Sequence, residues 1–155
     1  MLYLAVLLLG ITAGLRAATP LAAISIGAYL GWINLSGTWA AFLGSPVAVV
    51  VLIILAILEY IGDQLPKTPS RKAPMQFAGR VVAGALAGLF VTLPSGQWIA
   101  GVIIGALGGV LGTLGGYEAR RRLALALGRD LPAALIEDAV AIIVALLAAY
   151  LVRGA

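Results

Sequence analysis

Six ionisable side chains stand within or at the ends of long apolar runs of this chain: Arg16, Glu59, Asp63, Arg80, Glu137 and Asp138. A charge near the centre of a bilayer costs about 2.5–3.5 kcal/mol on insertion scales, so it needs a partner or water. Glu59 and Asp63 are four residues apart, which places both carboxylates on one face of a helix. We therefore predict a polar or ligand-binding site from Arg16, Glu59, Asp63, Arg80 and Glu137.

Two interpretations of these charges are open. They line a polar cavity that binds an ion, a proton or an anionic headgroup, or they form interhelical ion pairs and reach toward the cytoplasmic interface. The second interpretation is favoured for Asp63, Asp138 and Arg80. Arg16 and Glu59 suit both equally.

Arg16 lies in a segment that breaks a helix, Gly14-Leu-Arg-Ala-Ala-Thr-Pro20. Thr19 is the predicted N-cap of the next helix, and Pro20 its first residue. Helix ends inside a membrane direct unpaired backbone groups at a ligand, which adds weight to a site at Arg16.

The residue types that are missing exclude several kinds of chemistry. The chain has no cysteine and no histidine, which removes thiolate nucleophiles, imidazole bases and the usual zinc ligands. Neither a nucleophile–base pair nor a metal-ligand set is visible, so we expect no enzyme, no metal and no cofactor. A basic patch interleaved with aromatic residues is also missing, so nucleic acid is not an expected partner.

The elements that must position these charges are membrane-spanning helices. Of 155 residues, 63% are hydrophobic and 10% are charged, whereas soluble domains have about 25% charged residues. Because about 20 apolar residues cross the hydrocarbon, we predict an all-α polytopic bundle with about six spans. The runs are residues 2–15, 19–33, 47–65, 77–93, 98–116 and 130–152, with an interfacial helix or an extension of the fifth span over residues 117–128.

The first hairpin is short or broken, and the first helix is expected to be retained because no cation precedes it. We expect one transmembrane domain over residues 1–155, in which residues 1–66 form a first helical half and 77–155 a second. Between them lies a polar linker at 67–76, flanked and interrupted by Pro66, Pro69 and Pro74, with Pro66 and Pro69 ending the third helix. Three spans on each side would allow a 3+3 inverted-topology repeat.

The cations predict the orientation, since short loops rich in Lys and Arg stay in the cytoplasm. With six spans, only Arg153 lies on the outer side; the other cations are Arg16, Lys67, Arg71, Lys72, Arg80, Arg120, Arg121, Arg122 and Arg129. We therefore expect a multi-pass protein of the inner (plasma) membrane, with the Lys67 linker and the Arg120 cluster cytoplasmic and both termini outside. Trp32, Trp39 and Trp98 would lie near the outer interface.

The fifth span carries glycines at helical spacing: Gly101, Gly105, Gly108, Gly109, Gly112 and Gly116. In lipid, such faces let backbones approach closely, so two stripes indicate two close neighbours, within the chain or in a homodimer. Gly10 and Gly14, and Gly84 and Gly88, offer partner surfaces. The cluster Arg120, Arg121, Arg122 has two possible roles. It contacts anionic lipid headgroups, with a binding free energy of about 1 kcal/mol per cation, or it only sets the orientation of the chain in the membrane. We favour the second role.

The first half resembles an uncharacterised bacterial membrane-protein family known as domain of unknown function 4126. The resemblance rests on Gly14-Leu-Arg-Ala-Ala-Thr-Pro20, Leu30-Gly-Trp32, Ser45-Pro46, Leu58-Glu-Tyr-Ile-Gly-Asp-Gln-Leu-Pro66 and Arg80. The chain departs from the family pattern at Gln64, where that pattern has Lys. The resemblance implies an integral membrane protein with notable polar positions at Arg16, Pro20, Glu59, Asp63, Pro66 and Arg80, and it implies no activity.

The leading hypothesis is a transporter or channel-like protein for an ion or small anionic solute, forming a homodimer in the lipid bilayer, with its polar site near Arg16 and Glu59. One alternative is a membrane scaffold or assembly factor whose charges are structural pairs. Another is a protein that binds or flips an anionic lipid through the cytoplasmic arginines.

Overall fold

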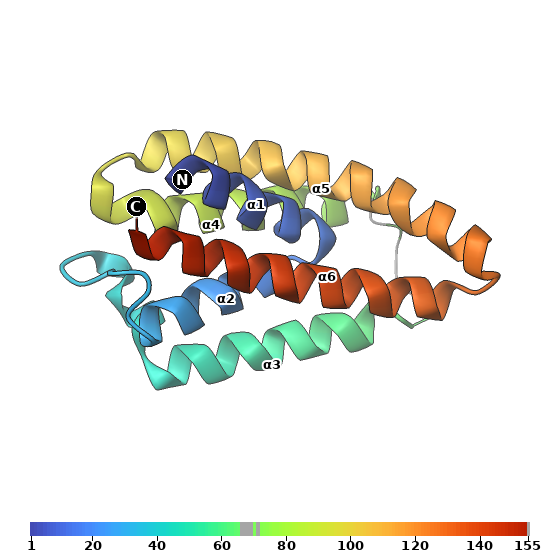
Figure 1. Ribbon diagram of the computed structural model, residues 1–155, viewed down its shortest axis with the longest axis horizontal. Coiled ribbons are helices and arrows are strands. Elements are labelled where there is room, and N and C mark those ends of the chain that lie inside the picture. The colour runs from blue at the N-terminus through green and yellow to red at the C-terminus, as the bar shows by residue number, and fades with distance from the viewer. Residues whose placement is uncertain (66–69, 71, 155) are drawn as a thin grey trace.

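The computed structural model describes residues 1–65, 70 and 72–154. Over these residues the chain is helical and has no strand, which confirms the predicted all-α class. The helices are α1 (Leu2–Leu15), α2 (Ala18–Tyr29), α3 (Pro46–Gly62), α4 (Pro74–Thr92), α5 (Trp98–Leu127) and α6 (Asp130–Leu151), with 3-10 turns at Trp39–Gly44, Leu93–Ser95 and Val152–Gly154 (Figure 1). Pro46 and Pro74 begin α3 and α4, where a missing backbone N–H costs nothing.

The helices run up and down along one long axis, and both chain termini lie at the same end of the bundle (Figure 1). This end is termed the termini end; the opposite end, where α3 stops, α4 starts and α5 turns into α6, is termed the basic end. Three helices are long and apolar enough to cross a membrane: α4 with its following turn, α5 and α6. α1, α2 and α3 are shorter apolar helices, so the described residues leave the count of six spans open.

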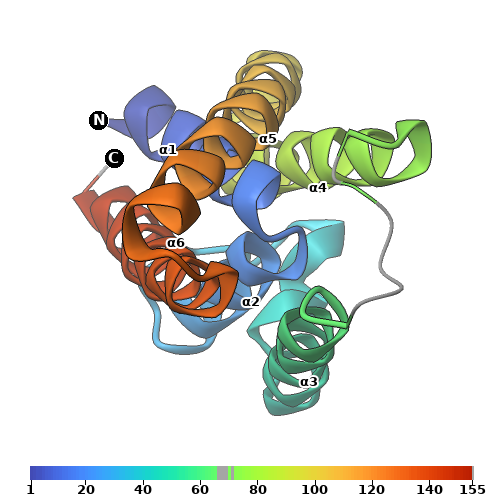
Figure 2. The same cartoon turned by 90° about the vertical axis from the view of Figure 1, so that its right-hand side faces the viewer.

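The first two helices form a short hairpin, as the sequence predicted. α1 has 14 residues and α2 has 12, so they rise about 21 Å and 18 Å, less than the roughly 30 Å of bilayer hydrocarbon. In the end view α2 lies near the middle of the bundle and α3 at its edge (Figure 2). The turn of the hairpin is therefore enclosed by neighbouring helices.

α5 uses its glycines to pack against two helices of the same chain. A Cβ added at Gly105 would lie 3.0 Å from the carbonyl carbon of Gly84 on α4, and one added at Gly108 would lie 2.7 Å from the carbonyl oxygen of Leu7 on α1. Gly101 and Gly109 also face α4, Gly112 faces Ile11 of α1, and Gly116 is buried. Because both glycine faces are occupied within one chain, this packing needs no second copy.

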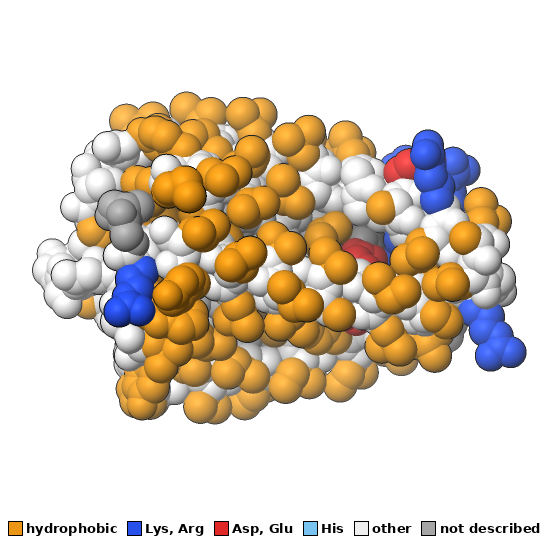
Figure 3. All heavy atoms as spheres, in the orientation of Figure 1, with side chains coloured by type: hydrophobic (Ala, Val, Ile, Leu, Met, Phe, Trp, Pro, Cys, Tyr) orange, Lys and Arg blue, Asp and Glu red, His pale blue; other side chains and the backbone are white. Residues whose placement is uncertain are grey.

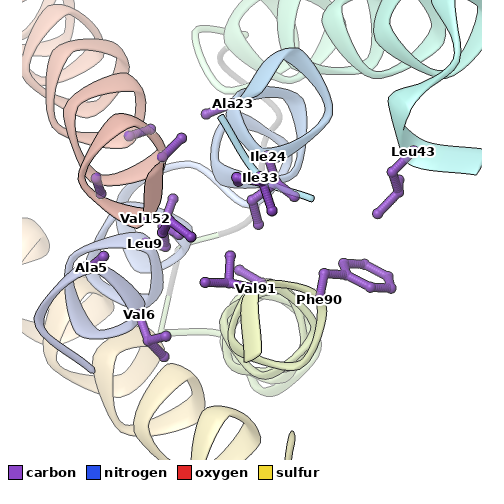
Figure 4. Packing of buried hydrophobic residues seen from close by; sticks show 14 of the residues in the cluster. Ala5, Val6, Leu9, Ala23, Ile24, Ile33, Leu43, Phe90, Val91 and Val152 are labelled. Atoms are coloured by element: carbon purple, nitrogen blue, oxygen red, sulfur yellow. The ribbon is translucent and has the colours of Figure 1, made fainter. Parts of the chain in front are cut away.

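The apolar core lies near the termini end. Val6 and Leu9 of α1, Ile24 of α2 and Val91 of α4 are buried against one another (Figure 4). The loop after α2 folds back over them through the buried residues Ile33, Leu35, Ala40 and Leu43, and Ser25 Oγ donates a hydrogen bond to the carbonyl of Leu43 at 2.5 Å. This loop closes the termini end of the bundle.

α3 packs on α2 and on the Trp39–Gly44 turn, and Ala56 is its only buried residue. Its other apolar side chains, such as Val50, Ile54 and Leu58, are about half exposed. Such a surface suits lipid as its solvent. The polar end of α3, from Glu59 to Asp63, contacts Arg80 of α4 and the residues between α1 and α2.

Several predicted boundaries were wrong. The second helix ends at Tyr29 rather than near residue 33, because the chain turns at Gly31, where φ is +76°. α4 starts at Pro74, inside the expected linker at 67–76. By contrast, one of the two alternatives for residues 117–128 is confirmed: α5 continues without a break to Leu127 and turns at Gly128, where φ is +70°, so residues 117–127 extend the helix. Pro66, Lys67, Pro69 and Arg71 lie outside the described residues, and α3 already ends at Gly62.

The contacts of the two halves differ. α4 packs closely along α5, whereas α1 and α2, their counterparts in a 3+3 repeat, have few contacts with each other. α1 also packs on α6, but α4 has no comparable contact with α3. The packing thus gives the inverted repeat no support.

The described cations other than Arg16 and Arg153 belong to the basic end. Lys72 and Arg80 lie at the start of α4, Arg120, Arg121 and Arg122 near the end of α5, and Arg129 in the turn to α6. The space-filling view shows an apolar face with blue side chains gathered at one end and a single blue group at the other (Figure 3). Acidic side chains show between the apolar middle of this face and its basic end (Figure 3).

Candidate functional site

The break between α1 and α2 leaves backbone groups at two helix ends without partners inside their own helices. Arg16 occupies the break in an extended conformation, with φ −146° and ψ 111°. Arg80 of α4 donates from Nη1 to the carbonyl oxygen of Gly14 at 3.0 Å and to that of Leu15. A side chain from a distant part of the chain therefore caps the end of α1.

The start of α2 is capped in the same way, by a carboxylate from α3. Glu59 accepts hydrogen bonds from the backbone N–H of Ala17 at 2.7 Å and of Ala18 at 2.8 Å. A carboxylate at a helix N-terminus also interacts favourably with the positive end of the helix dipole. The predicted cap was wrong: α2 begins at Ala18, Thr19 makes no capping bond, and Pro20 is the third helical residue.

Thr19 instead forms a hydrogen bond with Tyr60 of α3, at 2.6 Å between the hydroxyl oxygens. Gly14 does lie at the helix end, one residue before Leu15, and an added Cβ there would collide with the α5 backbone near Gly112 and Thr113. The tight contact with α5, together with Arg80, positions the break.

Arg16 is fully buried and bound by two carboxylates from different helices. Its Nε donates to Asp138 Oδ1 of α6 at 2.6 Å, Nη2 lies 2.5 Å from the same oxygen, and Nη1 pairs with Asp63 of α3. The ring centroid of Tyr60 lies 5.3 Å from the guanidinium carbon. A buried guanidinium with these partners is tightly held, because losing one partner would leave a desolvated charge.

Asp63 joins the two arginines. Its Oδ2 accepts from Arg80 Nη2 at 3.0 Å while it also pairs with Arg16. Oε1 of Glu59 lies 3.8 Å from Nη2 of Arg80. Arg16, Glu59, Asp63, Arg80 and Asp138 therefore form one group, termed the hairpin network, with side chains from α3, α4, α6 and the break itself. The group has one more carboxylate than guanidinium. The negative charge of Glu59 is compensated by the backbone N–H groups at the start of α2.

Glu137 does not join Arg16, although the sequence placed it in the predicted site. It lies 3.7 Å from Arg120 Nη1 of α5, and Arg120 also forms a two-pronged pair with Asp130, at 2.9 Å and 2.6 Å. Adjacent helical residues point about 100° apart. Asp138, rather than Glu137, continues the buried alanine face of α6 at Ala134, Ala141, Ala145 and Ala148, and this spacing was the signal that could have identified it.

Arg121 and Arg122 both bind Glu118 on their own helix, with contacts of 3.0–3.1 Å and 2.7 Å. Their side chains are 60% and 77% exposed, so both remain accessible at the basic end. Contact of this cluster with lipid headgroups and its role in orientation both stay predictions.

A cavity of about 490 Å³ opens at the basic end, between the ends of α3, α4, α5 and α6. It is termed the vestibule, and its charged and aromatic lining consists of Asp63, Arg80, Tyr117, Arg120, Arg121, Arg129 and Asp130. Four arginines against two aspartates make its wall electropositive. Asp63 and Arg80 belong to both the vestibule and the hairpin network, so the network forms part of the vestibule wall.

The fold and this site define a class: a helical membrane protein in which a broken hairpin, closed by buried ion pairs, meets a polar vestibule. The chain belongs to the family described as domain of unknown function (DUF4126), whose model matches residues 3–152. The match covers both halves of the chain. No curated protein and no solved structure matches it.

Proposed function

We propose that this protein is a transporter or channel-like protein for an ion or small anionic solute, with its polar site where the vestibule meets the hairpin network. The observation that carries the proposal is the juxtaposition of an open, electropositive cavity with buried charges at a helix break. Walls of one charge sign raise the local concentration of ions of opposite sign. A passive anchor would need neither feature.

The proposed location is the inner (plasma) membrane, with the basic end in the cytoplasm and both termini outside. The grouping of Lys72, Arg120, Arg121, Arg122 and Arg129 at one end supports this orientation. The homodimer also stays a proposal, and it would use a surface other than the glycine faces of α5, which α1 and α4 cover.

Flux into proteoliposomes tests the function. We expect wild-type protein to pass radiolabelled chloride, phosphate or acetate faster than empty vesicles do, with potassium and proton flux measured in parallel. Asp63→Asn should slow this flux because Asp63 lies at the contact between vestibule and network. Arg122→Gln is the matched control, since Arg122 is exposed and does not line the vestibule.

Each variant must first elute as a folded species and insert in the vesicles. If folded wild-type protein passes none of these ions above the empty-vesicle rate, the transport proposal is rejected. Equal flux for wild type and Asp63→Asn would reject the site and keep the function.

The second candidate is a membrane scaffold whose charges are structural. A specific observation favours it: Arg80 and Glu59 both satisfy backbone groups at the helix break. In this case Glu59→Gln lowers thermal stability in detergent while no solute is carried. Exchanging the charges of Arg16 and Asp138 should then restore stability lost in either single variant.

A further inference from the structure

The wall of the vestibule has two chemical characters. Guanidinium groups line it, among them Arg121 and Arg129. Apolar side chains line it as well: Leu65, Ala124 and Leu125, together with the ring of Tyr117. Leu125 is 75% exposed although it lies at the charged end of the molecule. An inorganic ion would use only the guanidinium groups.

The arginines differ in how far they are already bound. Arg80 is occupied by Asp63 and two carbonyl groups, and Arg120 by Asp130 and Glu137. Arg121 is 60% exposed, and Glu118 accepts hydrogen bonds from its Nε and Nη2 while also binding Arg122, which leaves Nη1 of Arg121 for a ligand. For the side chain of Arg129, the described residues provide no ion pair or hydrogen bond. A ligand would therefore meet the whole guanidinium of Arg129 and Nη1 of the exposed Arg121.

Arg121 lies on α5, and Arg129 lies in the turn from α5 to α6. Arginine presents a planar fork of donors that matches phosphate and carboxylate oxygens in pairs. A carboxylate has two oxygens, which one fork fills, whereas a phosphate monoester has three terminal oxygens and two charges. Lys72 brings another cation close to one lining residue, with Nζ 4.1 Å from the centroid of the Tyr117 ring. This arrangement favours phosphate.

The size of the cavity agrees with a larger ligand than a bare ion. About 490 Å³ falls within the range of roughly 300–1,000 Å³ that is typical of sites for organic small molecules. A phosphate group near Arg121 and Arg129 would leave room for an organic body beside Leu65 and Leu125.

We infer that the vestibule binds an organic phosphate, with its phosphate on Arg121 and Arg129 and its apolar part against Tyr117, Ala124 and Leu125. The inference rests on the proposed function, because it names the substrate class of the same vestibule. The phosphate comes either from a soluble monoester or from the headgroup of an anionic lipid, and the chemistry that recognises it is the same.

Binding of four probes to the full chain in phosphatidylcholine nanodiscs tests this inference: n-hexyl phosphate, inorganic phosphate, hexanoate and hexanol, each measured by titration calorimetry. We expect n-hexyl phosphate to bind at least about tenfold more tightly than each of the others. Arg129→Gln should weaken it by about tenfold, the size expected for one charge-assisted hydrogen-bonded contact. Arg122→Gln, which removes the same charge from the same end, should leave the affinity unchanged.

Three results would overturn the inference. Hexanol binding as tightly as n-hexyl phosphate would show an apolar site, and inorganic phosphate binding as tightly would show a simple ion site. Equal losses in Arg129→Gln and Arg122→Gln would show a general field effect. Thermal unfolding of both variants serves as the folding control. Arg129→Gln should unfold at the wild-type temperature, because the Arg129 side chain has no partner among the described residues.

A second arm identifies the source of the phosphate. Replacing part of the phosphatidylcholine by phosphatidylglycerol lowers the apparent affinity for n-hexyl phosphate in wild type, and not in Arg129→Gln, if lipid headgroups occupy the site. An unchanged affinity assigns the site to a soluble monoester. If the wild-type protein carries inorganic anions but does not bind n-hexyl phosphate, the inference is rejected and the transport function is kept. If it binds n-hexyl phosphate but carries no ion, the transport function is rejected and the inference is kept.

Discussion

The close contact between α4 and α5 makes Gly105→Ala a sharp test of how this bundle is held together. A methyl group at position 105 would lie 3.0 Å from the carbonyl carbon of Gly84, 3.2 Å from Gly88 Cα and closer still to the Gly84 carbonyl oxygen. All three are backbone atoms, so no side chain can rotate away. The two helices would have to part by roughly 1 Å, which forfeits about half of the dispersion energy of each contact across them.

Dispersion contacts are what hold helices together in lipid, where no hydrophobic force drives their association. Overpacking a close contact typically costs about 1–3 kcal/mol, and rigid backbone on both sides places Gly105→Ala at about 2 kcal/mol or more. For a chain of this size that corresponds to a fall in melting temperature of about 4–8 °C. The measurement is thermal unfolding in a maltoside detergent, followed by tryptophan fluorescence.

Gly115→Ala is the matched control, because it makes the same change on the same helix. No atom lies within 4 Å of an added Cβ at Gly115. Alanine is also favoured over glycine in helices, by up to about 1 kcal/mol, so the melting temperature should stay equal or rise. Equal melting temperatures for Gly105→Ala and Gly115→Ala would refute the packing argument.

Three further predictions concern the hairpin network and the orientation. Asp138→Leu removes one of the two carboxylates of a fully buried Arg16, and should cost about 3 kcal/mol in thermal unfolding; adding Arg16→Met should recover part of the loss, and no recovery would speak against a buried charge as the cause. Glu59→Gln keeps the side-chain shape but removes the charge that caps α2, and should lower stability by about 1 kcal/mol; the matched exposed change Glu118→Gln should lower it less. Since the chain has no cysteine, single-cysteine variants can map the orientation: Ser70→Cys and Arg122→Cys should react with an impermeant thiol reagent only from the cytoplasmic side, and Arg153→Cys only from outside, whereas labelling of Ser70→Cys and Arg122→Cys from opposite sides would contradict the topology.

Local patterns in the sequence were sufficient for the helices and for several of their contacts. Long apolar runs between prolines, glycines and charges predicted the class and most helix positions, because the bilayer requires backbone groups to be satisfied within each helix. The spacing of Gly101, Gly105 and Gly109, and of Gly108 and Gly112, likewise follows from the helical repeat alone. Where the chain departed from expectation, as at Tyr29, a tight turn after the helix decided the boundary.

The partners of the charges were decided by tertiary structure. Sequence reasoning assigned the cap of α2 to the nearby Thr19, because capping rules consider neighbouring residues, whereas the cap is Glu59, some forty residues away. Sequence reasoning also grouped Glu137 with Arg16. Adjacent residues on a helix point about 100° apart, so Asp138 pairs with Arg16 while Glu137 pairs with Arg120. The sequence by itself determined which residues are charged and on which helices they lie. Only the packing of α3, α4 and α6 around the hairpin determined which charges meet, because ion pairs depend on distances between helices that no local pattern encodes.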